Sequence, residues 1–188
     1  QKGGTNKEGI QMKTAVIYKS RYGYTEKYAK WIANELGADL MEAPVKPELL
    51  LQYDVVIYGG GLYAGGINGI DLVAKNPCKN LVIFTVGLSN PDTTDYSEIL
   101  EKQLPENVLS RTKVFHFRGG IDYSRLGIVH KGMMALLKKI LISKPDYEID
   151  INEKLIIATY GKEIDFTDNE SALPLIDYVK SIYEPLSA

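Results

Sequence analysis

The sequence has few of the residues that build disulfides and metal sites, and it has no large excess of either charge. Its 188 residues include one cysteine, two histidines and one tryptophan. A single cysteine, Cys78, excludes an internal disulfide and favours a reducing, cytoplasmic compartment. Two isolated histidines and one cysteine give no metal-ligand spacing, so we expect no metal site.

No apolar run approaches the length of a membrane span. The net charge of −2 lacks the basic excess typical of nucleic-acid binding, so we expect no nucleic-acid partner.

What is present fits one globular domain. Apolar residues make up 45% of the chain and charged residues 24%, a typical balance for a folded domain of this size. Residues 1–11 contain one apolar side chain, Ile10, and no apolar stretch like that of a signal peptide. We interpret them as a flexible tail or an artificial remnant and expect the fold to occupy residues 12–188.

Short apolar runs alternate with amphipathic segments along the chain. We expect strands at residues 12–19, 38–43, 53–60, 80–87 and 112–120, and helices at residues 25–37, 67–77, 92–104, 125–144 and 168–183. Several of the strands are apolar on both faces, which is typical of a parallel sheet covered by helices on each side. In such a doubly wound α/β fold, ligands bind beyond the carboxyl ends of the strands.

The segment after the first expected strand, residues 20–25 (SRYGYT), has the composition of an anion-binding turn. A tight turn requires Gly23, and a helix that begins near Thr25 presents amides without partners in its first turn. These amides, the hydroxyls of Ser20 and Thr25 and the helix dipole suit a phosphate monoester. The lysine and acidic partner of a magnesium-triphosphate loop are missing. The alternative is that Ser20 and Thr25 only cap the helix.

Two further segments follow the third and fourth expected strands. Residues 61–65 belong to a stretch, residues 59–69, that contains six glycines and can approach a flat ligand closely. Residues 86–89 offer backbone amides and an apolar side chain from the opposite side. Alternatively, Leu62 and Tyr63 pack on the domain, and residues 86–89 form an ordinary turn.

These three segments, in this order, resemble the flavodoxin family. Residues 20–25 are similar to its phosphate loop, Ser/Thr-x-Thr-Gly-x-Thr, with matches at Ser20, Gly23 and Thr25 and with Tyr22 in place of the middle hydroxyl residue. The resemblance runs from about residue 12 to residue 183. It implies a single-domain flavodoxin-like fold with a five-stranded parallel sheet of order 2-1-3-4-5.

The resemblance also implies non-covalent FMN, with its phosphate in the first segment and its ring system between the other two. The implied contacts are Ser20, Arg21, Tyr22, Gly23, Tyr24, Thr25, Gly61, Leu62, Tyr63, Ala64, Gly65, Val86, Gly87, Leu88 and Ser89. Because the flavin carries the chemistry in such proteins, we expect no catalytic acid–base side chain.

Two other families with this fold class are excluded by the same strand ends. A receiver domain needs an acidic pair after the first strand and an aspartate after the third, where this chain has Lys19–Ser20 and Tyr58–Gly59. A dinucleotide-binding domain needs G-x-G-x-x-G after the first strand, where only Gly23 is found.

Three segments resemble a narrower branch of the family, the one that contains menaquinone-dependent protoporphyrinogen IX dehydrogenase. They are TVGLSNP, RGGIDYSRLG and YGKEIDFTDNES. In that branch FMN takes hydrogen from the porphyrinogen and passes it to a quinone, a step of heme biosynthesis. The chain departs from it at Tyr63, where the branch has a basic residue, at Gly87, where it has an amide residue, and through a longer segment at residues 143–161.

The expected helix 125–144 combines apolar and basic residues. One stripe should face the sheet; it consists of Leu126, Val129, Met133, Leu136, Leu137 and Ile140. Five basic residues and no acidic ones lie between residues 123 and 145. Such a helix either has a solvated lysine face or contacts an anionic membrane, a propionate-bearing ligand or a protein partner.

Four aromatic or histidine side chains have less specific signals. Alternation predicts that His116 lies under a covering helix, as a structural residue. We expect His130 on the surface and Trp31 in packing with Tyr28. Tyr123 is either a gate over the candidate site or a packed tyrosine.

The sequence thus predicts an FMN-binding redox protein that transfers electrons to a protein partner. Two alternatives remain: an enzyme that acts on a porphyrinogen and a quinone, and a non-enzymatic domain that kept the fold without the flavin.

Overall fold

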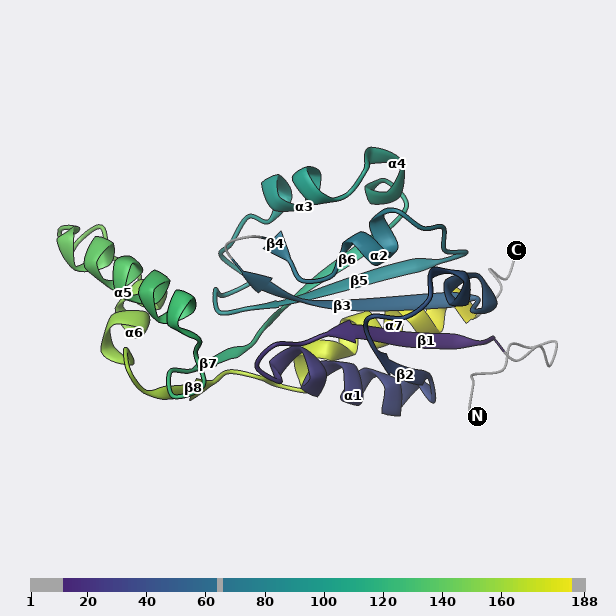
Figure 1. The fold of residues 1–188 in the computed structure, drawn as a ribbon, viewed down its shortest axis with the longest axis horizontal. Coiled ribbons are helices and arrows are strands. Elements are labelled where there is room, and N and C mark those ends of the chain that lie inside the picture. Colours follow the sequence, from purple (N-terminus) through teal and green to yellow (C-terminus); the bar gives the residue numbers. More distant parts are fainter. Residues whose placement is uncertain (1–11, 64–65, 184–188) are drawn as a thin grey trace.

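The computed structural model describes residues 12–63 and 66–183, which form a central parallel sheet with helices on both faces (Figure 1). The elements in chain order are β1 (Thr14–Lys19), α1 (Tyr24–Leu36), β2 (Asp39–Glu42), η1 (Pro47–Gln52), β3 (Val55–Tyr63), β4 (Gly66–Ile67), α2 (Asp71–Ala74), β5 (Leu81–Gly87), α3 (Ser97–Gln103), α4 (Glu106–Leu109), β6 (Lys113–Arg118), β7 (Gly120–Asp122), α5 (Ile128–Ser143), α6 (Ile151–Ala158), β8 (Glu163–Asp165), η2 (Glu170–Ala172) and α7 (Leu173–Tyr183).

The sheet confirms the expected class and strand order. Its strands follow the order β2-β1-β3-β5-β6, and every pair along this path is parallel. With β4 left aside, this is the predicted order 2-1-3-4-5. The short strand β4 pairs antiparallel with the end of β3 and was not predicted. The central strands are buried on both faces, as their continuous apolar runs indicate.

Two apolar cores cover the two faces of the sheet. On one face α1 and α7 pack against side chains such as Val16, Ile57 and Phe84. On the other face η1, α2 and α4 pack against the alternate side chains, among them Ile17 and Tyr58. This alternation follows from the pleat, because successive side chains of a strand point to opposite faces.

Helix α1 forms as the sequence predicts. Its buried residues recur at helical spacing, from Tyr28 and Ala29 to Ile32, Ala33 and Leu36. The helix ends at Gly37, whose φ of 60° lies in the left-handed region that favours glycine. Trp31 packs edge-on against Tyr28, with 5.2 Å between ring centroids, which confirms the expected packing role.

Residues 120–165 form a unit beside the sheet, which we call the side module. It consists of β7, α5, α6 and β8, and it extends beyond the carboxyl ends of the strands (Figure 1). The strands β7 and β8 pair antiparallel, and α5 packs on α6. Helix α6 begins with a capping box between Asp150 and Glu153. None of these elements except α5 was predicted.

The prediction that the apolar stripe of α5 faces the sheet is wrong for most of its residues. Val129 and Leu136 are 73% and 60% exposed, and Met133 and Ile140 are also exposed. Helix α5 lies in the side module, so its inward face is the one that carries His130, Met134 and Leu141. Helical periodicity identified which residues share a face, but a neighbouring element decides which face is covered. In the described part of the chain, no helix combines the length and apolar character needed to cross a membrane.

Gly59 provides a test of the packing at the centre of the sheet. A Cβ atom at this position would lie 2.1 Å from Cζ of Phe84, a ring with no solvent exposure. We expect Gly59→Ala to lower the free energy of unfolding by about 1–3 kcal/mol, because the buried ring has no space to move into. The measurement is urea unfolding of the purified variant.

Gly132 of α5 is the matched control. A Cβ there would meet nothing within 4 Å, so Gly132→Ala should be neutral or stabilise the protein by up to about 1 kcal/mol. Equal stability of the two variants would contradict the packing described for β3.

Candidate functional site

The carboxyl ends of the central strands meet at one edge of the sheet. Lys19 at the end of β1 pairs with Gly60 of β3, and Gly61 pairs with Val86 of β5. The three predicted segments therefore leave the sheet side by side, at the edge where doubly wound folds bind ligands.

Residues 20–25 form a tight turn into α1. Gly23 has a φ of 94°, which L side chains rarely adopt, and a Cβ there would meet nothing within 4 Å. Glycine is thus required by the backbone conformation, as predicted. The Ser20 hydroxyl accepts a hydrogen bond from the Gly23 amide at 3.0 Å. Gly23 itself occupies the N-cap position, and among the described residues no side chain caps the helix. The alternative interpretation, that Ser20 and Thr25 cap α1, is wrong, and Thr25 is buried at the second helical position.

The second segment begins as strand and not as loop. Gly61, Leu62 and Tyr63 belong to β3, because β4 turns back and pairs with Leu62 and Tyr63. Ala64 and Gly65 lie outside the described residues. The glycines of β3 allow close packing within the protein. A Cβ at Gly60, for example, would lie 2.4 Å from Ile67 Cγ2.

The third segment comes close to the second. A Cβ at Gly87 would lie 3.4 Å from Leu62 Cβ, so β3 and β5 are in van der Waals range where they end. Val86 is buried, Leu88 packs with the side module and Ser89 is exposed. The carbonyl oxygen of Leu88 accepts a hydrogen bond from Arg118 Nε at 3.3 Å.

An aromatic cluster joins the first two segments to the side module. Tyr22, Tyr63 and His130 lie with ring centroids 5.5–6.2 Å apart, and Tyr63 stacks on His130 at an interplanar angle of 17°. The Tyr22 hydroxyl and His130 Nδ1 are 2.5 Å apart. Burial raises the pKa of Tyr63 to about 12, so its hydroxyl stays protonated. The prediction of His130 as a surface residue is wrong, because α5 folds back over residue 22, a contact with no local sequence signal.

Tyr123 proves to be packed. It is buried beside Leu126 in a cluster that also includes Tyr22 and Leu88, and its ring lies 4.9 Å from that of Tyr160. Tyr123 is therefore part of the apolar cluster of the side module and not an exposed gate.

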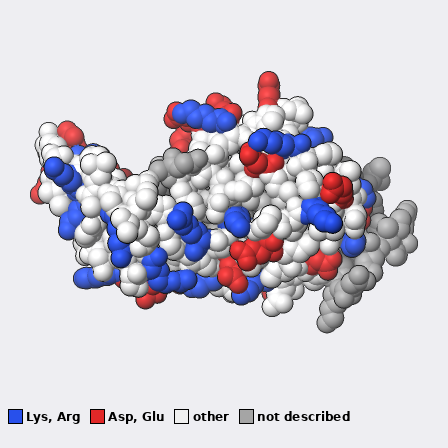
Figure 2. All heavy atoms as spheres, in the orientation of Figure 1, with Lys and Arg blue, Asp and Glu red and all other residues white. Residues whose placement is uncertain are grey.

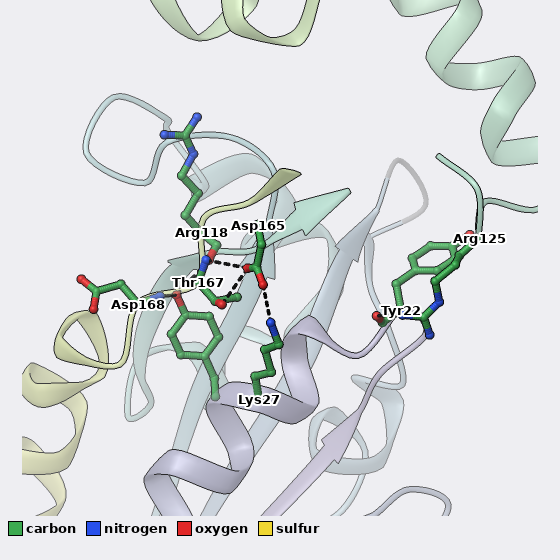
Figure 3. A network of polar contacts seen from close by, with 8 residues as sticks. Tyr22, Lys27, Arg118, Arg125, Asp165, Thr167 and Asp168 are labelled. Atoms are coloured by element: carbon green, nitrogen blue, oxygen red, sulfur yellow. Dashed lines mark hydrogen bonds and ion pairs between the residues drawn. The ribbon is translucent and has the colours of Figure 1, made fainter. Parts of the chain in front are cut away.

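Polar contacts hold the side module against α1. Figure 3 shows Lys27 of α1 and Thr167 converging on the carboxylate of Asp165. Burial alone would raise the pKa of Asp165, but the hydrogen bonds from Lys27 and Thr167 outweigh it and leave the pKa below its ordinary value. Arg125 Nη1 donates to the carbonyl oxygen of Tyr22 at 3.3 Å. This contact brings the positive charge of Arg125 to the first segment, which the sequence alone does not predict.

The residues from the first core strand to the end of α5 match a known family. The model described as "Flavodoxin domain" covers residues 15–148, well over half of the chain. The chain belongs to the flavodoxin-domain family. The match includes all three segments at the strand ends, and the strand order agrees with it.

Several solved flavodoxins and flavoproteins are similar to the chain at low identity. A WrbA-like flavodoxin from Agrobacterium tumefaciens is 21% identical, covers 53% of this chain and 71% of its own, and has a TM-score of 0.38. A flavoprotein in complex with FMN from Lactobacillus acidophilus NCFM is 14% identical, with coverages of 57% and 93% and a TM-score of 0.39. Oxidised Flavodoxin 2 from Bacillus cereus is 21% identical, with coverages of 56% and 84% and a TM-score of 0.43. No curated protein sequence matches the chain.

His116 lies on β6 near this edge of the sheet and is packed as predicted. Its ring stacks on Tyr96 with 3.8 Å between centroids, and its Nδ1 lies 2.6 Å from Thr85 Oγ1. Burial lowers the pKa of His116 to about 4, from an ordinary value of 6.5.

This pKa predicts a loss of stability in acid. Between about pH 6.5 and pH 4 the unfolded chain takes up a proton at His116 and the folded chain does not, so the free energy of unfolding falls as the pH falls. We expect a loss of about 1–2 kcal/mol, reduced from the full linkage value because the ring is partly exposed. Urea unfolding at several pH values measures it.

The variant His116→Phe supplies the comparison. It lacks the titrating group, so its stability should fall less steeply over the same pH range. Parallel slopes for the two proteins would contradict the assignment.

Proposed function

We propose that the protein binds FMN non-covalently at the carboxyl edge of the sheet and transfers electrons. The observation that carries the proposal is the left-handed turn at Gly23, which leads into a 13-residue helix whose first-turn amides no side chain caps within the described residues. Membership of the flavodoxin-domain family supports the choice of FMN among phosphate-bearing ligands.

The phosphate end of FMN fits the first segment. The amides of residues 24–26 have no intrahelical acceptors, and the dipole of α1 favours negative charge at this end. Arg125, held beside Tyr22, adds a positive charge that would further favour a phosphate dianion. The residues present therefore suit a terminal phosphate without a bound cation.

The ring end of FMN would lie between residues 61–65 and 86–89. Bound FMN supplies the reversible uptake of electrons, which no side chain of the protein can provide. The side chains of Leu62, Tyr63 and Leu88 would exclude water from the ring and fix its orientation. Tyr63 keeps its proton near neutral pH, because its pKa is about 12, so it would interact with the ring as an uncharged aromatic group.

Two roles fit this site, and they differ in the partner. The first is an electron carrier that serves a protein partner. The second is an oxidoreductase of the menaquinone-dependent protoporphyrinogen IX dehydrogenase type. The observation that favours the second is the side module, which brings the basic and apolar helix α5 to the site through His130. Under anaerobic conditions, an enzyme would oxidise protoporphyrinogen with a menaquinone analogue as acceptor, and a carrier would not.

A non-enzymatic domain without flavin is the remaining alternative. The family match speaks against it, because the matched residues 15–148 include the turn at Gly23 together with the two neighbouring segments at the strand ends. Purified protein that is colourless and does not bind added FMN would support this alternative and contradict the proposal.

Gly23→Val tests the role of the turn directly. A valine at a φ of 94° forces the turn to change, so we expect the variant to lose FMN, with at least a hundredfold weaker binding in a fluorescence titration.

Gly161→Val is the matched control, because Gly161 also has a positive φ, 84°, with nothing within 4 Å of its missing Cβ. It lies in the turn before β8, so this variant should suffer a similar loss of stability and keep its FMN affinity. Equal FMN affinity of the two variants would overturn the assignment of the phosphate site.

A further inference from the structure

The outward face of α5 is apolar and basic, and the described residues leave it uncovered. We propose that this face docks on the surface of an anionic lipid bilayer, with α5 lying along the membrane plane. The proposal concerns where the protein binds, and it does not depend on the binding of FMN.

Most of the large exposed apolar side chains in the described residues fall between residues 128 and 147. They are Ile128, Val129, Met133, Leu136, Ile140, Ile142 and Tyr147, with exposed fractions of 40–90%. Val129, Met133, Leu136 and Ile140 follow the i, i+4, i+7, i+11 pattern of a single stripe. A continuous exposed stripe of this kind marks an interaction surface more often than scattered apolar residues do.

The charged side chains of α5 itself are all basic. Lys131 and Lys139 are exposed on α5, and no acidic residue occurs between residues 123 and 145. Lys138 lies over the ring of Tyr160 at 4.2 Å. Lys144, the C-cap residue of α5, pairs with Glu153 at 2.7 Å, so an acid of the side module compensates its charge. In Figure 2 blue spheres are spread among white ones over this end of the molecule, with some red spheres near its rim. Such a face complements negatively charged headgroups above an apolar layer.

A second copy of the chain fits this face less well. In a two-fold dimer the same patch would meet itself, so Lys131 and Lys139 would approach the like charges of the other copy. Because α5 itself carries no acid to compensate them, this contact between the two helices would be unfavourable. A bilayer has no such conflict, because lysine side chains can extend to the headgroups while the apolar stripe contacts the acyl chains.

Docking would bring the membrane close to the candidate site. His130 lies on the inward face of the same helix and contacts Tyr22 and Tyr63. An α-helix with its side chains is about 10–12 Å thick, so the site would lie roughly one helix diameter from the lipid.

Vesicle flotation of the intact protein tests the proposal. We expect binding to vesicles of phosphatidylcholine with about one third phosphatidylglycerol, and little binding to phosphatidylcholine alone. The double variant Leu136→Glu/Ile140→Glu should bind the anionic vesicles at least tenfold more weakly. The matched control Leu51→Glu/Leu173→Glu changes side chains of similar exposure on η1 and α7, 50% and 49%, and should bind as the unmodified protein does.

A second pair of variants tests the charges. Lys131→Gln/Lys139→Gln should weaken binding to the anionic vesicles roughly tenfold to thirtyfold at low salt, whereas Lys46→Gln/Lys180→Gln should change it little. Circular dichroism and FMN affinity, measured in parallel, show whether each variant is folded and keeps its site.

Three outcomes would overturn the proposal. They are the absence of binding to either vesicle, equal binding by the α5 variants and their controls, and a dimer in sedimentation analysis that the Leu136→Glu/Ile140→Glu variant loses. The last result would assign the face to a second copy of the chain.

Discussion

The parallel pairing of β1 with β3 and of β3 with β5 is the constraint on which the candidate site depends. This register sets Lys19 beside Gly60 and Gly61 beside Val86, so three segments far apart in sequence leave the sheet together. Small residues in β3 make the arrangement possible, because Phe84 occupies the space where a side chain of Gly59 would lie. A larger residue there would separate β3 from its packing partners and alter the edge where the segments meet. The packing at the centre of the sheet therefore determines how the three segments lie at its edge.

The side module is the second determinant of the site. It is joined to the sheet between β6 and α7, and its base is fixed by the hydrogen bond from the Phe166 amide to the carbonyl oxygen of Gly119, at 2.9 Å. The ion pair between Lys27 and Asp165 ties the same base to α1. Through these contacts α5 is held where His130 reaches Tyr22 and Tyr63. One surface of α5 thus completes the aromatic cluster, and the other is left for a partner.

Much of the sheet could be predicted from the sequence, because its signals are local. Continuous apolar runs identify strands buried on both faces, and glycine at positions 23 and 37 brackets α1 to within one residue. The resemblance in residues 20–25 also led to the family. Strand alternation alone also predicts that His116 lies beneath a covering segment, and in the structure its ring stacks on Tyr96.

The remaining features depend on contacts between distant residues. The sequence predicts a loop at residues 61–63, yet they extend β3, because β4 turns back and pairs with Leu62 and Tyr63. The periodicity of α5 defined its apolar stripe but gave no information on which neighbour would cover it. His130 and Arg125 reach residue 22 across more than 100 positions of sequence, a contact that only the folded side module creates. For these residues the sequence gives the identity of the side chain but does not indicate which distant residue it contacts.

The central claim is that the turn between β1 and α1 holds the phosphate of FMN. Parallel titrations with FMN and with riboflavin, which lacks the phosphate, test it most directly. The account predicts that FMN binds at least roughly a hundredfold more tightly, the equivalent of two charge-assisted hydrogen bonds at the first turn of α1. Equal affinity for the two flavins would show that this turn does not bind the phosphate and would contradict the account.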